Sequence, residues 1–184
     1  MKHQLSVKQV VAIGIGSAVF FILRSYVSIP VAFIPNTTIQ SSYPFLALMS
    51  VLFGPIVGFT IGLIGHALND AFIWGGIWWT WVAGSAILGA LFAYSANGKE
   101  LSNGEFGTKA IIRFNIIQVL GNFIVWGLIA PIGDIIVYSE PVNRVFTQGI
   151  FAGITNAIAV GIIGTILLKG YASTRTKKGS LTQE

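Results

Sequence analysis

Long, almost uncharged apolar runs alternate with short polar segments along this chain. The apolar runs can be drawn at roughly residues 7 to 27, 39 to 53, 55 to 69, 78 to 95, 111 to 129 and 145 to 168. A spanning helix needs about 20 mostly apolar residues, and helices satisfy their own backbone groups in lipid. The pattern predicts an all-α membrane protein, built as a compact bundle of transmembrane helices.

The number of helices depends on one stretch, PFLALMSVLFGPIVGFTIGLIGHAL. It could form one long helix kinked at Gly54-Pro55 or two short helices, so five and six spans are both open. Six spans with a cytoplasmic N-terminus place nine basic residues inside and leave only Arg24 and Arg144 outside. The inner nine are Lys2, Lys8, Lys99, Lys109, Arg113, Lys169, Arg175, Lys177 and Lys178. Because inner loops favour Lys and Arg, we expect six helices with both termini cytoplasmic.

Residues 1–184 are expected to form one integral-membrane domain, in which residues 170–184 are a disordered basic cytoplasmic tail. The outer side then carries Ser28–Pro44, the turn at Gly75-Gly76 and the segment Ala130–Arg144. The inner side carries a flexible polar loop, SANGKELSNGEFGTK. Polar groups that could bind a ligand are therefore concentrated outside.

Composition narrows the chemistry that the chain can perform. Hydrophobic residues make up 54% and charged residues 9%, whereas a soluble domain carries about a quarter charged residues. Without cysteine there are no thiolate ligands or nucleophiles, and the two histidines make no metal site. No Walker loop is present, so an ATP-driven step must belong to another chain. We expect no catalysis, no cofactor, no metal and no nucleic-acid partner.

The third run ends in a polar cluster. His66, Asn69 and Asp70 are spaced i, i+3 and i+4, so they share one helical face. Such groups are costly at membrane depth unless they pair or line a water-filled cavity. The cluster indicates a ligand pocket, and the alternative is that it bridges and caps neighbouring helices.

Two later runs add polar positions. Asn115, Gln118, Asn122 and Trp126 form a stripe on the fifth run, where Asn122 and Trp126 are expected to line a cavity and the inner two to glue helices. Gln148 lies near the outer end of the sixth run and could face the same cavity. Glu140 and Arg144 are expected to form a solvated i, i+4 pair.

Four tryptophans, Trp74, Trp78, Trp79 and Trp81, lie within eight residues. An interfacial belt explains Trp79 or Trp81, because tryptophan is enriched where membrane meets water. Anchoring one helix end at the membrane interface does not require four tryptophans. Trp78 or Trp74 is therefore a candidate for stacking on a planar ligand.

The first run contains the small-xxx-small pairs Ala12 and Gly16, and Gly14 and Ala18. Small residues at this spacing let another helix approach closely, from this chain or from a partner. Arg24, at the outer end of the run, could snorkel or meet an anionic group.

Together these motifs resemble the substrate-binding S component of energy-coupling factor (ECF) vitamin transporters. The resemblance runs from about Val7 to Leu168 and rests on VVAIGIGSAVFF, IPNT, FLALMSVLFGPIVG, GHALNDA, WWTW and EPVNRVFTQG. It is closest to a subfamily associated with riboflavin, hydroxymethylpyrimidine and pyridoxine.

The resemblance implies a role in a bacterial plasma membrane. The S component would capture a vitamin from outside and topple in the bilayer to deliver it. A membrane coupling protein (EcfT) and two cytoplasmic ATPases (EcfA and EcfA′) would supply the energy. The small-residue stripe, Ala12, Gly14, Gly16 and Ala18, would dock on the coupling protein. The first outer loop, with Asn36 and Thr37, would act as a lid.

The pocket that this topology predicts gathers His66, Asn69, Asp70, Trp78, Asn122, Trp126 and Gln148 beneath the lid residues. Amides, one carboxylate, one histidine and indoles suit a small, flat, neutral or weakly basic heterocycle. Hydroxymethylpyrimidine or a pyridoxine-like vitamer fits best, and riboflavin is the alternative. A self-sufficient carrier or channel is the rival of a different class.

Overall fold

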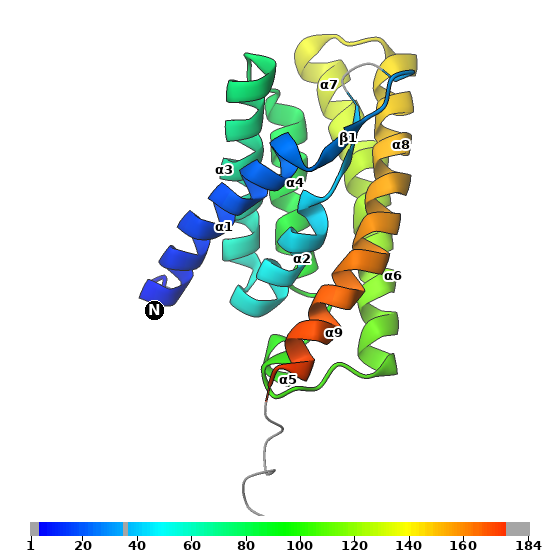
Figure 1. Ribbon diagram of the computed structural model, residues 1–184. Helices are drawn as coiled ribbons and strands as arrows, with labels where there is room; N and C mark the ends of the chain where they lie inside the picture. The colour runs from blue at the N-terminus through cyan, green and yellow to red at the C-terminus, as the bar shows by residue number, and fades with distance from the viewer. Residues whose placement is uncertain (1–3, 35–36, 176–184) are drawn as a thin grey trace, which may run out of the picture.

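The computed structural model describes residues 4–34 and 37–175, and most of these residues are helical (Figure 1). The elements in chain order are α1 (Val7–Tyr26), β1 (Ser28–Pro30), β2 (Thr38–Gln40), α2 (Ser42–Phe53), α3 (Pro55–Asn69), η1 (Asp70–Trp74), α4 (Trp79–Phe92), α5 (Gly98–Ser102), α6 (Thr108–Ile124), η2 (Val125–Ile129), α7 (Ala130–Tyr138), α8 (Val142–Ala159), η3 (Val160–Gly164) and α9 (Thr165–Ser173). The three η elements are π-helical turns that continue an α-helix.

Four continuous helices in the described residues are long and apolar enough to cross a membrane. They are Val7–Tyr26, Pro55–Trp74, Thr108–Tyr138 and Val142–Ser173, and two shorter apolar helices, α2 and α4, accompany them. The predicted helical membrane-protein class is therefore confirmed. The start of α1 and the end of α9 both lie toward the lower end of the bundle in Figure 1, and the orientation in a membrane stays a prediction.

The stretch around Gly54 forms two helices, not one kinked helix. Gly54 has φ 95°, a left-handed conformation that glycine adopts at no steric cost. Pro55 then occupies the first turn of α3, where its missing N–H is not needed. The chain consequently reverses, and α2 and α3 pack against each other.

Small residues bring α3 and α4 into close contact. A Cβ on Gly58 would collide with the carbonyl oxygen of Gly89, and a Cβ on Gly89 would collide with that of Gly58. A Cβ on Gly62 would likewise meet the carbonyl oxygen of Ser85. Such close backbone approach is how helices associate where lipid removes the hydrophobic driving force. It fixes α3, which carries His66, against α4, which carries Trp79 and Trp81.

The outer segment Ala130–Arg144 is mostly helical, so the fifth helix extends beyond the apolar run that was expected to end near residue 129. The fifth helix continues through η2 and α7 to Tyr138. Pro131 has no N–H, and its ring would clash with the carbonyl of an ideal α-turn. The π-helical turn directly before it relieves that conflict, so the helix can continue and place Asp134 inside the bundle.

The inner loop is also more ordered than expected. Asn97 caps the short helix α5 by accepting from the backbone N–H groups of Lys99 and Glu100. Leu101 and Phe106 are buried in the hydrophobic core. Two apolar side chains therefore anchor a segment whose polar composition suggested a flexible loop.

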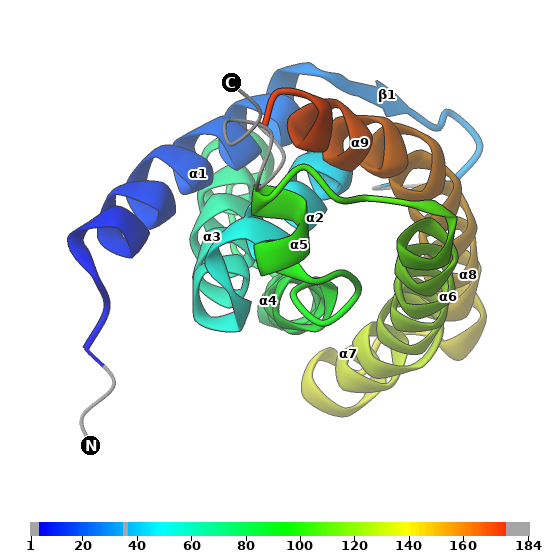
Figure 2. The same cartoon turned by 90° about the horizontal axis from the view of Figure 1, so that it is seen from below.

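The first outer loop contains a small antiparallel ladder of β1 and β2, with Ser28 opposite Gln40 and Pro30 opposite Thr38. Its polar sequence gave no period-two signal long enough to predict strands. β2 contacts α8, so the ladder reaches from the end of α1 across the bundle. Seen from below, α1 runs obliquely past α3, with its N-terminal end standing away from the other helices (Figure 2).

The expectation of a disordered tail from residue 170 is wrong for its first residues. α9 is helical to Ser173, and Arg175 contacts the Tyr171 ring through its guanidinium group, 4.3 Å from the ring centroid. Residues 176–184 of that tail lie outside the described residues.

Candidate functional site

A cavity of about 500 Å³ opens at the end of the bundle where η1 turns into α4. Polar and aromatic side chains from α1, β2, α2, α3, α4, α7 and α8 meet there. The lining consists of Arg24, Thr37, Thr38, Gln40, Tyr43, His66, Asp70, Trp74, Gly75, Gly76, Ile77, Trp78, Trp81, Asp134, Tyr138, Glu140, Arg144, Gln148, Ala152 and Asn156. This volume is in the range of roughly 300–1,000 Å³ that small-molecule sites occupy.

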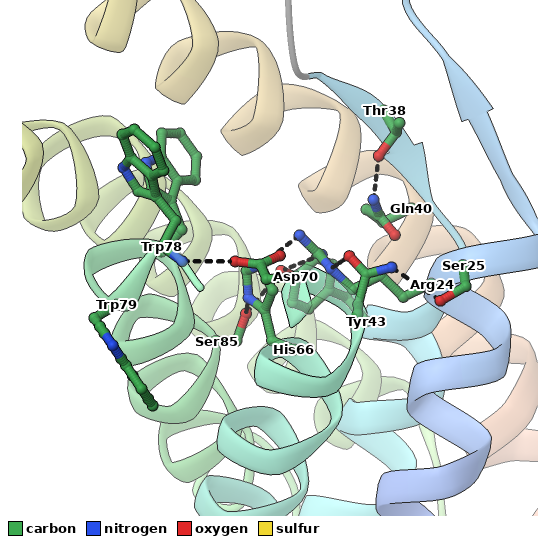
Figure 3. A network of polar contacts seen from close by, with 12 residues as sticks. Arg24, Ser25, Thr38, Gln40, Tyr43, His66, Asp70, Trp78, Trp79 and Ser85 are labelled. Atoms are coloured by element: carbon green, nitrogen blue, oxygen red, sulfur yellow. Dashed lines mark hydrogen bonds and ion pairs between the residues drawn. The ribbon is translucent and has the colours of Figure 1, made fainter. Parts of the chain in front are cut away.

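Arg24 is the centre of a polar network at the base of this cavity (Figure 3). Its Nη2 lies 2.6 Å from His66 Nε2, its Nε donates to Asn69 Oδ1 at 3.1 Å, and its Nη1 donates to the Tyr43 hydroxyl at 3.1 Å. One guanidinium thus ties the end of α1 to both α2 and α3. The planar fork of five donors explains how one side chain serves three partners.

The contact with Arg24 also fixes the tautomer of His66. Arginine can only donate, so Nε2 of His66 accepts and the ring proton is assigned to Nδ1. Nδ1 lies 2.6 Å from Ser85 Oγ on α4, and that hydroxyl lies 2.9 Å from the Tyr43 hydroxyl. His66 is 1% exposed, so a neutral imidazole connects three helices in the interior.

Asp70 positions the beginning of α4. Its Oδ2 accepts from the Trp78 backbone N–H at 3.1 Å, across the turn in which Gly75 has φ 76°. Its Oδ1 lies 3.3 Å from Nε2 of His66. Because that nitrogen accepts from Arg24, it carries no proton that it could donate to Asp70.

Asp134 is a second buried carboxylate, 2% exposed, on α7. Its Oδ1 accepts from Trp78 Nε1 at 2.9 Å and from the Thr80 hydroxyl, and its Oδ2 accepts from Trp81 Nε1 at 2.6 Å. All three donors belong to the start of α4. In the part of the chain that the structure describes, no basic side chain forms an ion pair with Asp134.

Aromatic rings form one wall of the cavity. Trp78 lies against Tyr138, with ring centroids 4.7 Å apart. Trp81 stacks on Trp126 at 5.7 Å and 15° between planes, and Tyr43 meets the same Trp126 edge-on at 5.4 Å. The lining indoles are therefore held in place by hydrogen bonds to Asp134 and by rings packed behind them.

The structure brings five of the predicted binding residues to the cavity: Thr37, His66, Asp70, Trp78 and Gln148. Asn69 instead lies beside a smaller cavity of about 300 Å³, where its amide donates to Ser25 Oγ at 2.9 Å. Asn36 lies outside the described residues.

Asn122 and Trp126 do not line the cavity, which corrects the prediction for the fifth helix. Trp126 is buried behind Trp81, and its Nε1 donates to Asn122 Oδ1 at 3.2 Å. Asn122 in turn donates to Gln118. The polar side chains of this stripe form their hydrogen bonds along one helix and with α8. They therefore hold helices together and do not line the cavity.

Sequence reasoning missed several lining residues. Gln40, Tyr43, Asp134 and Asn156 line the cavity but were not among the predicted binding residues. Asp134 is the residue that could have been found, since a carboxylate inside an apolar helix is rare without a function. For Arg24 the sequence predicted only that it could snorkel or meet an anionic group.

Glu140 and Arg144 form the predicted i, i+4 pair, with 3.0 Å between Oε2 and Nη1. Both residues line the cavity as well as contacting solvent. The described residues contain no group of three or more acidic or histidine side chains that could hold a metal.

The small-residue stripe on α1 divides between two faces. Ala12 and Gly16 are buried, and a Cβ on Gly16 would lie 2.5 Å from Ile61 Cδ1 of α3. Gly14 and Ala18 are exposed, with open space around Gly14. Ala12 and Gly16 thus serve packing within the chain, which corrects their assignment to a docking surface, and only Gly14 and Ala18 are open to a partner.

Comparison with known proteins identifies the family. The model of the family described as "ECF-type riboflavin transporter, S component" matches residues 4–173. A UPF0397 protein of Enterococcus faecalis is 58% identical over 184 residues, 100% of both chains. UPF0397 protein YdcD of Lactococcus lactis is 58% identical over 179 residues, 97% of this chain and 98% of the relative.

A solved structure, described as "Structure and mechanism of the S component of a bacterial ECF transporter", has the same fold. The TM-score is 0.65 at 23% identity, over 91% of this chain and 96% of that one. At this identity the structural match establishes only the fold. The match to the family model is what assigns the sequence to the family. The chain belongs to the family of ECF-type S components, the substrate-binding subunits of ECF transporters.

Proposed function

We propose that this S component binds a small, flat vitamin or vitamin precursor in the cavity between η1, α4, β2 and α8. Hydroxymethylpyrimidine or a pyridoxine-like compound is the favoured class. The observation that carries the proposal is the convergence of fixed indoles with isolated polar groups around one cavity of about 500 Å³. Binding sites for small heterocycles combine such aromatic walls with a few placed donors and acceptors.

The polar lining supports a compact ligand with hydrogen-bonding edges. Gln40, Asp134 and Asn156 offer acceptors, and Arg24 offers a cation already engaged by three neighbours. A strongly anionic ligand would have to compete with Glu140 for Arg144, and with His66, Asn69 and Tyr43 for Arg24. A neutral or weakly basic heterocycle meets no such competition.

Riboflavin is a second candidate, and two observations favour it. The family model that matches the chain is described as a riboflavin transporter S component. The cavity is also larger than a single substituted pyrimidine or pyridine ring requires. A flavin could use the same indole wall, with its ribityl chain directed toward the smaller cavity beneath β1 and β2.

In the proposed orientation the cavity faces the extracellular side and both termini face the cytoplasm, as the distribution of Lys and Arg predicts. The outer loop that includes Thr37 would cover the bound ligand. A coupling protein (EcfT) and two ATPases (EcfA and EcfA′) would then drive release into the cell. The exposed positions Gly14 and Ala18 on α1 are where the coupling protein would approach.

The test is to purify the chain alone, release any retained small molecule by denaturation and identify it by mass spectrometry. Titration of the identified compound back onto ligand-free protein should give one site. Flavin fluorescence in the released fraction would select riboflavin, and a pyrimidine or pyridine mass would select the favoured class. Uptake by vesicles that hold this chain without ATPases would overturn the proposal in favour of a self-sufficient carrier.

A further inference from the structure

The cavity carries more negative than positive charge. Among the described residues that line it, three are acidic, Asp70, Asp134 and Glu140, and two are arginines, Arg24 and Arg144. Arg144 pairs with Glu140, and Arg24 contacts His66, whose Nε2 lies 3.3 Å from Asp70. Asp134 forms no ion pair with any described basic side chain.

The hydrogen bonds around Asp134 suit an ionised carboxylate with one position to spare. Two indole N–H groups, which can only donate, reach one oxygen each, and Thr80 shares Oδ1 with Trp78. A carboxylate offers about four acceptor sites. Three are used by the protein, so Oδ2, which accepts only from Trp81, can take one more donor.

Two further acceptors in the cavity lack partners. Gln40 Oε1 and Asn156 Oδ1 are buried and accept no hydrogen bond from the described residues. Gln40 is 7% exposed and Asn156 is 2% exposed, and both line the cavity. Leaving a buried acceptor unpaired is costly, so these oxygens indicate donors on the occupant.

The aromatic wall adds a preference for positive charge. Trp78, Trp81 and Tyr138 all line the cavity beside Asp134. The faces of such rings attract cations, and the attraction grows when water is excluded. A buried anion surrounded by rings is an arrangement that a ligand cation can complete.

We propose, resting on the proposed function, that the ligand is a cationic, donor-rich heterocycle. Its positively charged nitrogen lies beside Asp134 and the indoles, and its other donors satisfy Gln40 and Asn156. The ligand then supplies the positive charge that no described side chain supplies to Asp134. A neutral analogue leaves the carboxylate unbalanced, which provides selectivity by charge as well as by shape.

The experiment uses the full chain in detergent and two probes that differ at one group. Pyridoxamine carries an ammonium where pyridoxine carries a hydroxyl on the same ring. Titration calorimetry at neutral pH should give at least about tenfold tighter binding for pyridoxamine. Asp134→Asn should remove that preference, and Glu105→Gln, the matched loss of a carboxylate on the exposed inner loop, should keep it.

The charge of the molecule retained by the purified chain gives a second test of the inference, and this test needs no variant. A retained compound that is cationic at neutral pH supports the inference even if Asp134→Asn fails to fold. A retained neutral compound, or equal affinity for the two probes, overturns the inference and leaves the proposed function intact. If nothing is retained and neither probe nor riboflavin binds, the proposed function fails as well.

Discussion

Arg24 and His66 meet across 42 residues of sequence, with 2.6 Å between Nη2 and Nε2. The contact joins the end of α1 to the helix that carries the polar cluster of the cavity. It gives the guanidinium a function inside the bundle, whereas the sequence suggested that Arg24 could snorkel or meet an anionic group. α1 therefore contributes Arg24 to the base of the cavity. The same helix carries the exposed face, with Gly14 and Ala18, that is open to a partner.

Replacing Arg24 by lysine should weaken both the fold and ligand binding. Lysine keeps the charge but lacks the planar fork, so it cannot bond His66, Asn69 and Tyr43 together. Loss of hydrogen bonds to a charged group predicts a cost of about 2 kcal/mol for Arg24→Lys. Thermal unfolding in detergent and titration of the retained ligand measure the two effects, and unchanged values in both would contradict the assigned network.

The hydrogen bond between Trp81 and Asp134 can be removed without removing the ring. Trp81→Phe keeps an aromatic surface on Trp126 but leaves Asp134 Oδ2 without its protein donor. We expect destabilisation by about 1–3 kcal/mol, because a buried acceptor loses its partner. Asp134→Asn in the same background should recover part of that loss, and thermal unfolding of the double variant checks it. A double variant no more stable than Trp81→Phe would show that the unpaired acceptor Oδ2 of Asp134 is not the cause.

Close packing of α3 on α4 predicts a strong response to one methyl group. Gly58→Ala would drive a Cβ into the carbonyl oxygen of Gly89, and backbone cannot move aside as a side chain can. Overpacking of this kind costs about 1–3 kcal/mol. Gly14→Ala, on the open face of α1, is the matched control and should be neutral or slightly stabilising. Equal melting temperatures for the two variants would refute the predicted interhelical contact.

A larger side chain should have different effects on the exposed and the buried face of α1. Ala18→Leu on the exposed face should leave ligand binding unchanged and impair uptake when the coupling protein and ATPases are co-expressed. Gly16→Leu should instead destabilise the folded chain, since the new side chain would overlap with the side chain of Ile61. Normal coupled uptake by the Ala18 variant would exclude this face of α1 as the docking surface.

The sequence predicted the membrane-protein class, the six apolar runs and five of the residues that line the cavity, each for a physical reason. Long apolar runs are a strong signal, and the i, i+4 spacing of His66 and Asp70 places both on one face whatever the tertiary fold. The nearby tryptophans marked the same end of the bundle. These features depend on local sequence alone.

The remainder depended on tertiary contacts that spacing does not encode. Asp134 reaches the cavity only because a π-helical turn carries the helix past Pro131. Trp126 fits a cavity position on a helical wheel, yet Trp81 from another helix stands in front of it. Gly16 and Gly14 look alike in sequence, and the approach of α3 decides which one is buried.

The central claim is that a planar ligand binds against the indole wall of the cavity, and neighbouring tryptophans allow a matched test. Trp78 lines the cavity, whereas Trp79 is 55% exposed and points away from the polar network (Figure 3). The measurement is titration of the retained compound onto ligand-free wild type, Trp78→Ala and Trp79→Ala. Losing a stacked ring predicts at least about tenfold weaker binding for Trp78→Ala. Affinity within about twofold of wild type is expected for Trp79→Ala, which loses a ring outside the cavity. Equal affinities for the two variants, or a larger loss for Trp79→Ala, would contradict the assignment of this cavity as the binding site.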